Sequence, residues 1–233
     1  MPAGHNSHRH HDTGGANDGI LIVMFDPGDL TLQHGEVLLR PLTHSDAPAL
    51  AEAAEGLRGQ TLFTTVPDAA DAGRAYVDHA LAMRSAGTRF PMVIIWQARV
   101  VGSTSYMRYQ PWEWPLGSQR QRANRPDIVE IGYTWLAASA QRTACNTTAK
   151  LALLTHAFES WQVHAVLLRT DARNRQSRTA IARLGAKLDG VLRADMPSSD
   201  NLVRSTAQYS ILASEWAAVR ASLQRRLSPV GRD

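Results

Sequence analysis

The segments EIGYTWL (Glu130–Leu136), QRTACNTTAK (Gln141–Lys150) and TDARNRQSRTAIARLGA (Thr170–Ala186) decide the fold that we expect for this chain. The first segment has the composition of a strand, and the polar turn after it opens an amphipathic helix over residues 147–161. An apolar run at residues 165–170 predicts the next strand, and a second capped helix follows it. Strand, anion-cradling turn, helix, strand and helix in this order predict an α/β arrangement that can hold a long phosphate-bearing ligand.

The flanking sequence extends this arrangement to a single-domain, mixed, mostly antiparallel sheet with helices on both faces. Strands are expected at residues 36–42, 90–96, 100–109, 129–136, 165–170, 187–193 and 203–212. Helices are expected at residues 43–58, 68–85, 147–161, 174–185 and 214–226. We expect one domain over residues 29–227. A disordered His/Gly-rich tail with a short apolar run (residues 1–28) precedes it, and a short tail (residues 228–233) follows it.

The composition excludes several classes of protein. The chain has 233 residues, of which 44% are hydrophobic and 20% charged, as in an ordinary soluble globular protein. Because no apolar run approaches the roughly 20 residues of a membrane span, we expect a cytoplasmic protein without a membrane partner. The single cysteine, Cys145, excludes a disulfide framework and a cysteine-based zinc site, and we expect no metal.

The net charge of +4 favours anionic ligands, including a phosphorylated cofactor. The arginines are scattered, and their one cluster lies in the loop-like stretch Gln119–Arg125. We interpret this cluster as a solvated loop and expect no nucleic-acid partner, because a DNA-binding protein concentrates its basic residues on one face. Nucleic-acid association through this loop is the weakest alternative.

The turn before the helix at residues 147–161 is a candidate anion site. Free N–H groups and the helix dipole attract a pyrophosphate there, and Arg142 and Lys150 add positive charge. An ordinary capped helix start is the alternative, since Asn and Thr are common caps. The candidate cofactor-binding residues of this turn are Gln141, Arg142, Thr143, Ala144, Cys145, Asn146 and Thr147.

Two further places carry candidate chemistry. Glu130 begins a central strand, and partial burial beside Ile94 or Trp96 would raise its pKa and let it accept a proton from an amine. Asn174 and Ser177 open the next helix, either as an ordinary cap or as contacts for the amide arm of a cofactor. Strand alternation predicts Glu130, Gly132 and Thr134 on one face and Ile131, Tyr133 and Trp135 on the other.

These segments, together with LLRPL at Leu38–Leu42, resemble the GNAT superfamily of acyl-CoA-dependent N-acyltransferases, and most closely its Rim-type branch. The resemblance covers about residues 30–227 and implies the GNAT fold, with a splay between two central strands. It also implies acetyl-CoA as co-substrate, with Glu130 and Ser177 as catalytic residues. The backbone of one strand would pair with the pantetheine arm, through Ile131, Gly132, Tyr133, Thr134, Trp135 and Leu136.

The resemblance implies an N-acetyltransferase acting by direct attack of a primary amine, either a protein N-terminus or a small molecule. Trp112 and Trp114, in the long loop before the catalytic strand, are the candidate acceptor-binding residues; a flexible surface loop is the alternative. The chain departs from the family pattern at two glycines of the cradle, replaced by Ala144 and Asn146, and at a tyrosine general acid, replaced by Ile181. These departures motivate the alternative of a non-catalytic acyl-CoA-binding regulatory protein. The oligomeric state stays open, with a homodimer as one alternative.

Overall fold

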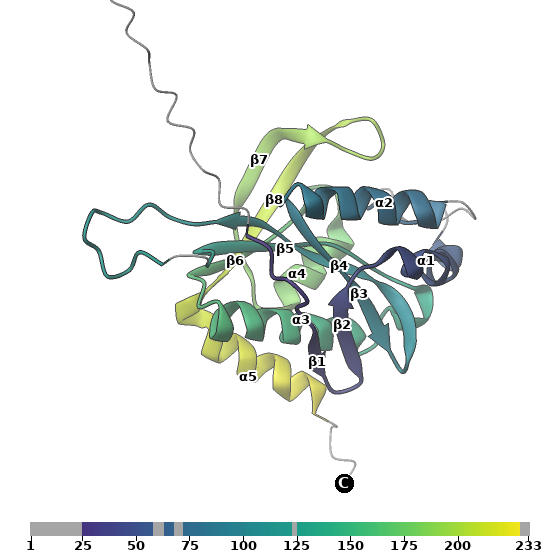
Figure 1. The fold of residues 1–233 in the computed structure, drawn as a ribbon, viewed down its shortest axis with the longest axis horizontal. Coiled ribbons are helices and arrows are strands. Elements are labelled where there is room, and N and C mark those ends of the chain that lie inside the picture. The colour runs from purple at the N-terminus through teal and green to yellow at the C-terminus, as the bar shows by residue number, and fades with distance from the viewer. Residues whose placement is uncertain (1–24, 58–62, 68–71, 123–124, 229–233) are drawn as a thin grey trace, which may run out of the picture.

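The fold is one twisted sheet flanked by helices (Figure 1). The structure, a computed structural model, describes residues 25–57, 63–67, 72–122 and 125–228. Within them the strand order is β1-β2-β3-β4-β5-β6-β8-β7, and only β5 and β6 run parallel. The expected mixed, mostly antiparallel sheet is therefore confirmed. The strands are β1 (Leu32–His34), β2 (Val37–Pro41), β3 (Arg89–Trp96), β4 (Arg99–Gln110), β5 (Ile128–Leu136), β6 (Ala165–Asp171), β7 (Lys187–Pro197) and β8 (Val203–Leu212).

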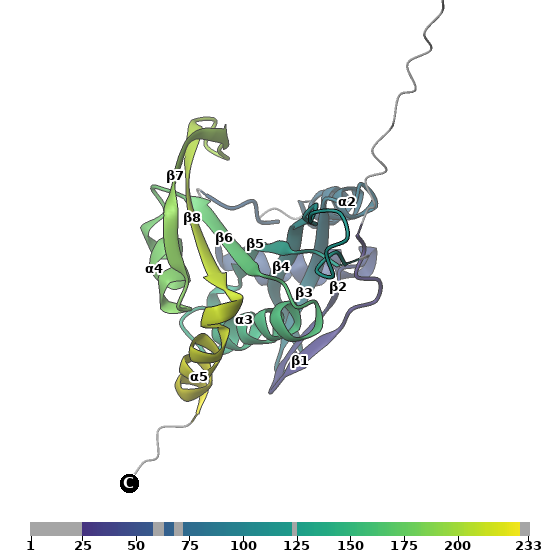
Figure 2. The same cartoon turned by 90° about the vertical axis from the view of Figure 1, so that its left-hand side faces the viewer.

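Helices cover both faces of the sheet, as expected, and each face has its own apolar core. Leu50 of α1 and Val77 of α2 pack with Trp135 on one face. Leu154 of α3, Ile181 of α4 and Leu223 of α5 belong to the larger core on the other face. Figure 2 shows α2 and α3 on opposite sides of the sheet. The helices are α1 (Ala47–Ala54), α2 (Ala72–Ser85), α3 (Cys145–Thr155), α4 (Arg175–Arg183) and α5 (Trp216–Leu227).

Helix α3 is the central helix of the larger core. It begins two residues before the expected start and continues as a π-helical turn, His156–Ser160, instead of a regular helix to residue 161. Residues 148–154 are all buried, because α3 lies between the sheet and α5.

The parallel strands β5 and β6 separate soon after they begin. Their pairing runs only from Ile128 opposite Ala165 to Glu130 opposite Leu167, whereas β5 continues to Leu136. The backbone of β5 beyond Glu130 is therefore unpaired on its β6 side. This is the splay that the resemblance implied, and it places Glu130 where the two strands part.

A β-bulge in β5 corrects the expected alternation of its side chains. Ser105 pairs with Gly132 and Ser103 with Trp135, so that two residues, Tyr133 and Thr134, lie opposite Thr104. Tyr133 has a φ of 49°. Such a bulge shifts the side-chain alternation by one residue. Thr134 therefore faces α3, Trp135 faces α1 and α2, and the prediction that Thr134 shares a face with Glu130 is wrong.

The N-terminal part of the chain adds two described features to the expected fold. Phe25, within the expected tail, packs against Tyr109 and Trp161, with ring centroids 4.9 and 5.3 Å apart. β1, which was not expected, follows and pairs with β2. Residues 1–24, the predicted beginning of α2 at residues 68–71 and the final residues 229–233 lie outside the described residues. Among the residues described, none of the helices has the length and apolar character to cross a bilayer.

Candidate active site

Glu130 lies buried where β5 and β6 part, with only 5% of the residue exposed. Its Oε2 atom is 2.9 Å from Nε of Arg108 and 3.9 Å from Nη1 of Arg169, yet no donor is aligned to form a hydrogen bond with it. Burial raises the pKa of this carboxyl group, and the charges of Arg169, Arg108 and Arg204 oppose the rise. Burial therefore shifts the pKa of this carboxyl group in the direction that a general base near neutral pH requires, and the catalytic role of Glu130 stays a prediction.

The neighbours of Glu130 differ from those expected. Ile94 and Trp96 belong to the core on the α3 face, whereas Met107 lies directly opposite Glu130 on β4. A Cβ atom at Gly132 would come within 3.0 Å of Met107 Sδ and 3.4 Å of Glu130 Oε1. Glycine at this position therefore keeps space free beside the carboxylate.

The turn that leads into α3 has the features of a candidate anion cradle. Arg142, Thr143 and Ala144 are exposed, and Arg142 has a left-handed φ of 60°. At a helix start the first N–H groups have no acceptor one turn earlier, which leaves those of Asn146 and Thr147 available to a ligand. Ala144 has a φ of −67°, so the backbone conformation at this position does not itself require glycine.

Other polar groups in this turn form hydrogen bonds within the protein. The hydroxyl group of Thr143 accepts a hydrogen bond from the N–H of Cys145 and donates one to the carbonyl of Ala140. Gln141 donates through its side-chain amide to the carbonyl of Leu136. The Cys145 side chain is buried in the core, and burial raises the pKa of its thiol to about 11.

The sequence analysis expected Lys150 to add positive charge to the anion cradle, and the structure shows that it does not. It is 5% exposed, and its Nζ atom donates to Thr134 Oγ1 at 2.6 Å, with Thr104 Oγ1 at 3.5 Å. Burial lowers the pKa of its amine to about 7. The side chain points into the sheet because Lys150 lies on the face of α3 that covers the β5 bulge.

Asn174 caps α4, since its Oδ1 atom accepts a hydrogen bond from the N–H of Ser177 at 2.9 Å. Ser177 is half-buried in the first turn of α4, and its catalytic role stays a prediction. Ile181, at the position of the family tyrosine, is buried in the core. The structure thus shows the capping role of Asn174, and a contact between this helix start and a cofactor stays a prediction.

Trp112 and Trp114 lie at the other end of β5 and β6 from the splay. The Trp112 ring stacks on His164, with centroids 5.0 Å apart, and Trp114 meets the same histidine edge-on at 5.7 Å. Asp127 accepts the N–H of Trp112 and forms an ion pair with Arg122. The loop is thereby anchored beside the first residues of both strands, and an acceptor-binding role for the two tryptophans stays a prediction.

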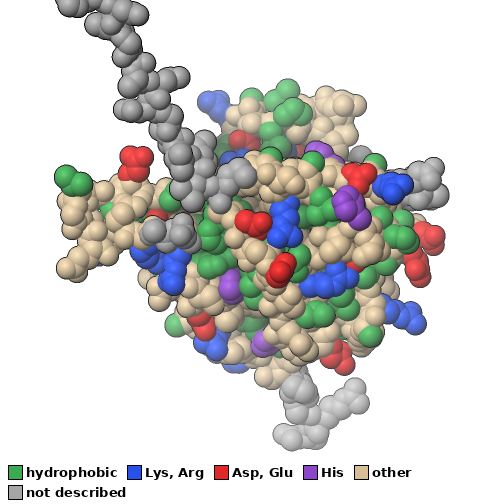
Figure 3. All heavy atoms as spheres, in the orientation of Figure 1, with side chains coloured by type: hydrophobic (Ala, Val, Ile, Leu, Met, Phe, Trp, Pro, Cys, Tyr) green, Lys and Arg blue, Asp and Glu red, His purple; other side chains and the backbone are tan. Residues whose placement is uncertain are grey.

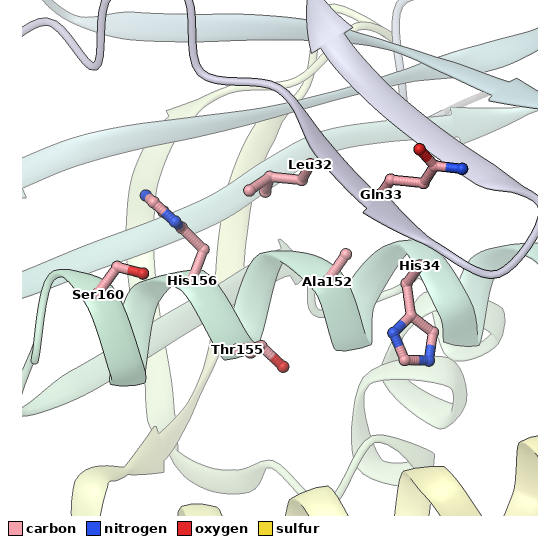
Figure 4. Close-up of a pocket in the computed structure, with 7 residues that line it drawn as sticks. All are labelled: Leu32, Gln33, His34, Ala152, Thr155, His156 and Ser160. Atoms are coloured by element: carbon pink, nitrogen blue, oxygen red, sulfur yellow. The ribbon is translucent and has the colours of Figure 1, made fainter.

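The surface hollow beside β1 does not include Glu130. A hollow of about 240 Å³ lies between β1 and the α3 face, lined by Leu32, Gln33, His34, Ala152, Thr155, His156 and Ser160. Figure 4 shows Ala152 and His156 rising toward β1 from α3 and its π-helical continuation. Figure 3 shows basic and acidic side chains interspersed on the face that it displays. Such mixing agrees with the modest net charge.

Comparison with known proteins decides the family. The family model described as the acetyltransferase (GNAT) domain matches residues 36–187. The chain belongs to the GNAT acetyltransferase family. No curated protein matches the chain significantly.

Solved structures show the same GNAT fold. A GCN5-related N-acetyltransferase from Brucella melitensis superimposes with a TM-score of 0.75 at 22% identity, over 89% of both chains. Mycobacterium smegmatis RimJ, solved in complex with CoA-disulfide, gives 0.65 at 20% identity over 85% of this chain and 93% of its own. The Salmonella typhimurium acetyltransferase that modifies the N-terminal serine of ribosomal protein L7/L12 gives 0.61 at 17% identity, over 77% and 96%.

GNAT acetyltransferases use acetyl-CoA as co-substrate, and two observations on this chain fit that ligand. The unpaired edge of β5 beyond Glu130 offers backbone groups to the amide-bearing pantetheine arm. The exposed turn at residues 142–144 and the start of α3 offer N–H groups and one arginine to the pyrophosphate. When bound, the co-substrate supplies the acetyl group as a thioester.

Arg142 provides a test of the cradle. We expect Arg142→Gly to raise the free energy of unfolding by roughly 1 kcal/mol, because glycine adopts a left-handed conformation without steric cost. We expect the same change to weaken CoA binding roughly fivefold, because an exposed charge beside the phosphates is lost. Denaturant unfolding and calorimetric titration with CoA measure the two effects. Arg142→Ala is the control, since it removes the charge but keeps a side chain in the left-handed backbone conformation. Unchanged CoA affinity in both variants would show that Arg142 lies away from the phosphates.

Proposed function

We propose that this GNAT protein is an N-acetyltransferase that moves an acetyl group from acetyl-CoA to a primary amine by direct attack. The observation that carries the proposal is the position of Glu130, buried with a raised pKa at the point where β5 and β6 part. A carboxylate at this point adjoins the unpaired β5 backbone on which the thioester end of the co-substrate would lie. The space kept by Gly132 leaves room there for the reacting groups.

Glu130 accepts the proton of the attacking amine, directly or through a water molecule. The amine nitrogen forms a bond to the acetyl carbonyl carbon, and the carbon–sulfur bond of the thioester breaks as the thiolate leaves. A backbone N–H of residues 131–133 polarises the carbonyl oxygen. Ser177, half-buried at the start of α4 where Ile181 occupies the position of the family tyrosine, relays a proton from solvent to the departing sulfur, and Glu130 returns the proton of the amine to solvent.

The acceptor belongs to the class of primary amines. One structural neighbour is described as modifying the N-terminal serine of a ribosomal protein. A protein N-terminus is therefore one candidate acceptor, and a small-molecule amine is the other. A cytoplasmic location, inferred from the sequence, suits both.

The proposal is tested by following thiol release from acetyl-CoA with a panel of peptides and small amines, and by detecting the acetylated product by mass spectrometry. Transfer to at least one amine, faster than the uncatalysed reaction, is the expected result. Calorimetry with CoA on the same preparation separates the alternatives. Tight CoA binding without transfer to any amine would contradict the proposal and support the non-catalytic acyl-CoA-binding alternative.

A further inference from the structure

Two arginines contact Glu130, and a third, Arg204, is linked to them by hydrogen bonds through Thr206 and Asp195. Arg108 lies on β4, Arg169 on β6 and Arg204 on β8, and the charges of all three act on the Glu130 carboxyl group. They project from the face of the sheet that carries Glu130, since the residues of β8 that alternate with Arg204 and Thr206 belong to the α3 core. The helices on that face, α1 and α2, pack over β3 and β4.

Arg169 is neutralised by a partner of its own. Its Nη2 atom donates to Asp195 Oδ2 at 2.7 Å, and the same oxygen accepts the hydroxyl of Thr206 at 2.7 Å. Arg173 nearby is likewise paired, with Asp171 and Asp200. These ion pairs reduce the charge repulsion between neighbouring arginines.

Arg108 and Arg204 are less completely paired. Arg108, whose side chain is 47% exposed, contacts Glu130 through Nε, and its two terminal nitrogens are not used in that contact. Arg204 donates its Nε to a neutral hydroxyl group, that of Thr206, at 2.9 Å, and the carboxylates of Asp171, Asp195 and Glu130 act on it only over longer distances. Two guanidinium groups therefore have donors available for an anion beside the candidate base.

Local strain and unsatisfied atoms mark the same place. Arg108 has a left-handed φ of 50°, within a register irregularity of β4 between Met107 and Gln110. Strained backbone of this kind clusters at ligand sites. Two buried atoms have no hydrogen-bond partner there, Glu130 Oε2 and Arg169 Nε, although both side chains are more than nine-tenths buried. A ligand with polar groups can satisfy such atoms, which otherwise carry a desolvation cost.

We propose that the acceptor is an amine that also carries a carboxylate a few bonds away, which Arg108 and Arg204 bind while the amine faces Glu130. The inference rests on the proposed transferase function and specifies its substrate class. Two sources supply this chemistry: a free amino acid, through its α-carboxylate, and a peptide whose N-terminus is followed by an acidic side chain. Guanidinium groups bind carboxylates with charge-assisted, directional hydrogen bonds, which makes them selective for such acceptors.

Matched pairs of acceptors test the inference. The first pair is an amino acid and its amide, and the second is a peptide with Asp or Asn at its second position. We expect kcat/KM to be about 10- to 100-fold higher for the carboxylate member of at least one pair. A ratio of this size corresponds to the free energy of a hydrogen bond to a charged group. Whichever pair shows the preference identifies the source of the carboxylate.

Variants then locate the preference. Arg108→Gln and Arg204→Gln should each reduce it at least fivefold, mainly through KM, and Arg204→Lys should restore part of it. Arg193→Gln, an exposed arginine on β7, is the matched control and should leave the preference unchanged. Equal rates within both pairs, or a preference that survives both glutamine variants, would overturn the inference while transfer itself continues. Absence of transfer to every amine would overturn the proposed function, and this inference with it.

Discussion

Glu130→Gln is expected to lower kcat/KM for acetyl transfer by about 10²- to 10⁴-fold, which is the usual contribution of a general base. Glutamine keeps the size of the side chain and removes its ability to accept a proton. Because Glu130 lies at the point of strand separation and not in the turn before α3, the affinity for CoA should change little. Initial rates of thiol release and calorimetry with CoA measure the two quantities.

The pH dependence distinguishes a base from a structural residue. Burial raises the pKa of Glu130 above its ordinary value, so the wild-type rate should fall on acidification at a higher pH than for an exposed glutamate. This acidic limb should be absent in Glu130→Gln. It should move to higher pH in Arg169→Met, since the charge of Arg169 is the largest influence that holds the pKa down.

Glu52→Gln, an exposed glutamate on α1, is the matched control and should behave like the wild-type protein. Thermal unfolding shows whether each variant is folded. A folded Glu130→Gln protein with near wild-type kcat/KM and an unchanged acidic limb would contradict a proton-accepting role for Glu130.

The second large effect is expected at Lys150 and concerns stability. We expect Lys150→Met to raise the free energy of unfolding at pH 6.5 by roughly 1–4 kcal/mol, because it removes a charged group from an apolar interior. Methionine has a similar length and fits irregular cores. Thr104 and Thr134 should keep a partner in the variant, since their hydroxyl groups lie 2.8 Å apart.

The sign of the pH dependence follows from the lowered pKa. The amine has a pKa of about 7 in the folded protein and its usual 10.5 when unfolded, so between these values the unfolded chain binds more protons. Stability of the wild-type protein should therefore rise with pH from about 7 to about 10.5, and below pH 7 the full cost of the buried charge should be present. Lys150→Met should lack this rise, and its advantage should shrink toward pH 10.

The sequence contains only one other lysine, Lys187, which is exposed and paired with Glu215. Lys187→Met is therefore the matched control for denaturant unfolding at each pH. NMR of protein labelled in lysine should show two side-chain signals, one titrating near pH 7 and lost in Lys150→Met. A signal lost in Lys150→Met that titrates near the usual 10.5 would contradict the burial of the Lys150 amine.

Much of the fold and part of the candidate site could be predicted because their signals are local in sequence. The strand at residues 128–136, the turn after it and the capped helix α4 follow from alternation, polar turn residues and the cap formed by Asn174. Each depends on residues within a few positions of one another, where backbone geometry and capping chemistry act. The resemblance of these segments to the GNAT superfamily agrees with the family that the comparison established.

Tertiary structure decided what depends on strands that are distant in sequence. The bulge at Tyr133 exists because two residues of β5 lie opposite Thr104 of β4, and this reverses the face on which Thr134 lies. Packing of α3 over that bulge buries the amine of Lys150, which was predicted to add positive charge to the anion site.

The surroundings of Glu130 were determined in the same way. The sequence alone indicated a carboxylate at a strand start, but its burial and its arginine neighbours come from β4, β6 and β8, which are separated by tens of residues. The periodicity of a single strand carries no information about which side chains its partners bring alongside. Local patterns therefore determined the elements and their order, and the register between strands determined the charge, burial and reactivity of the site, because these properties depend on contacts across the sheet.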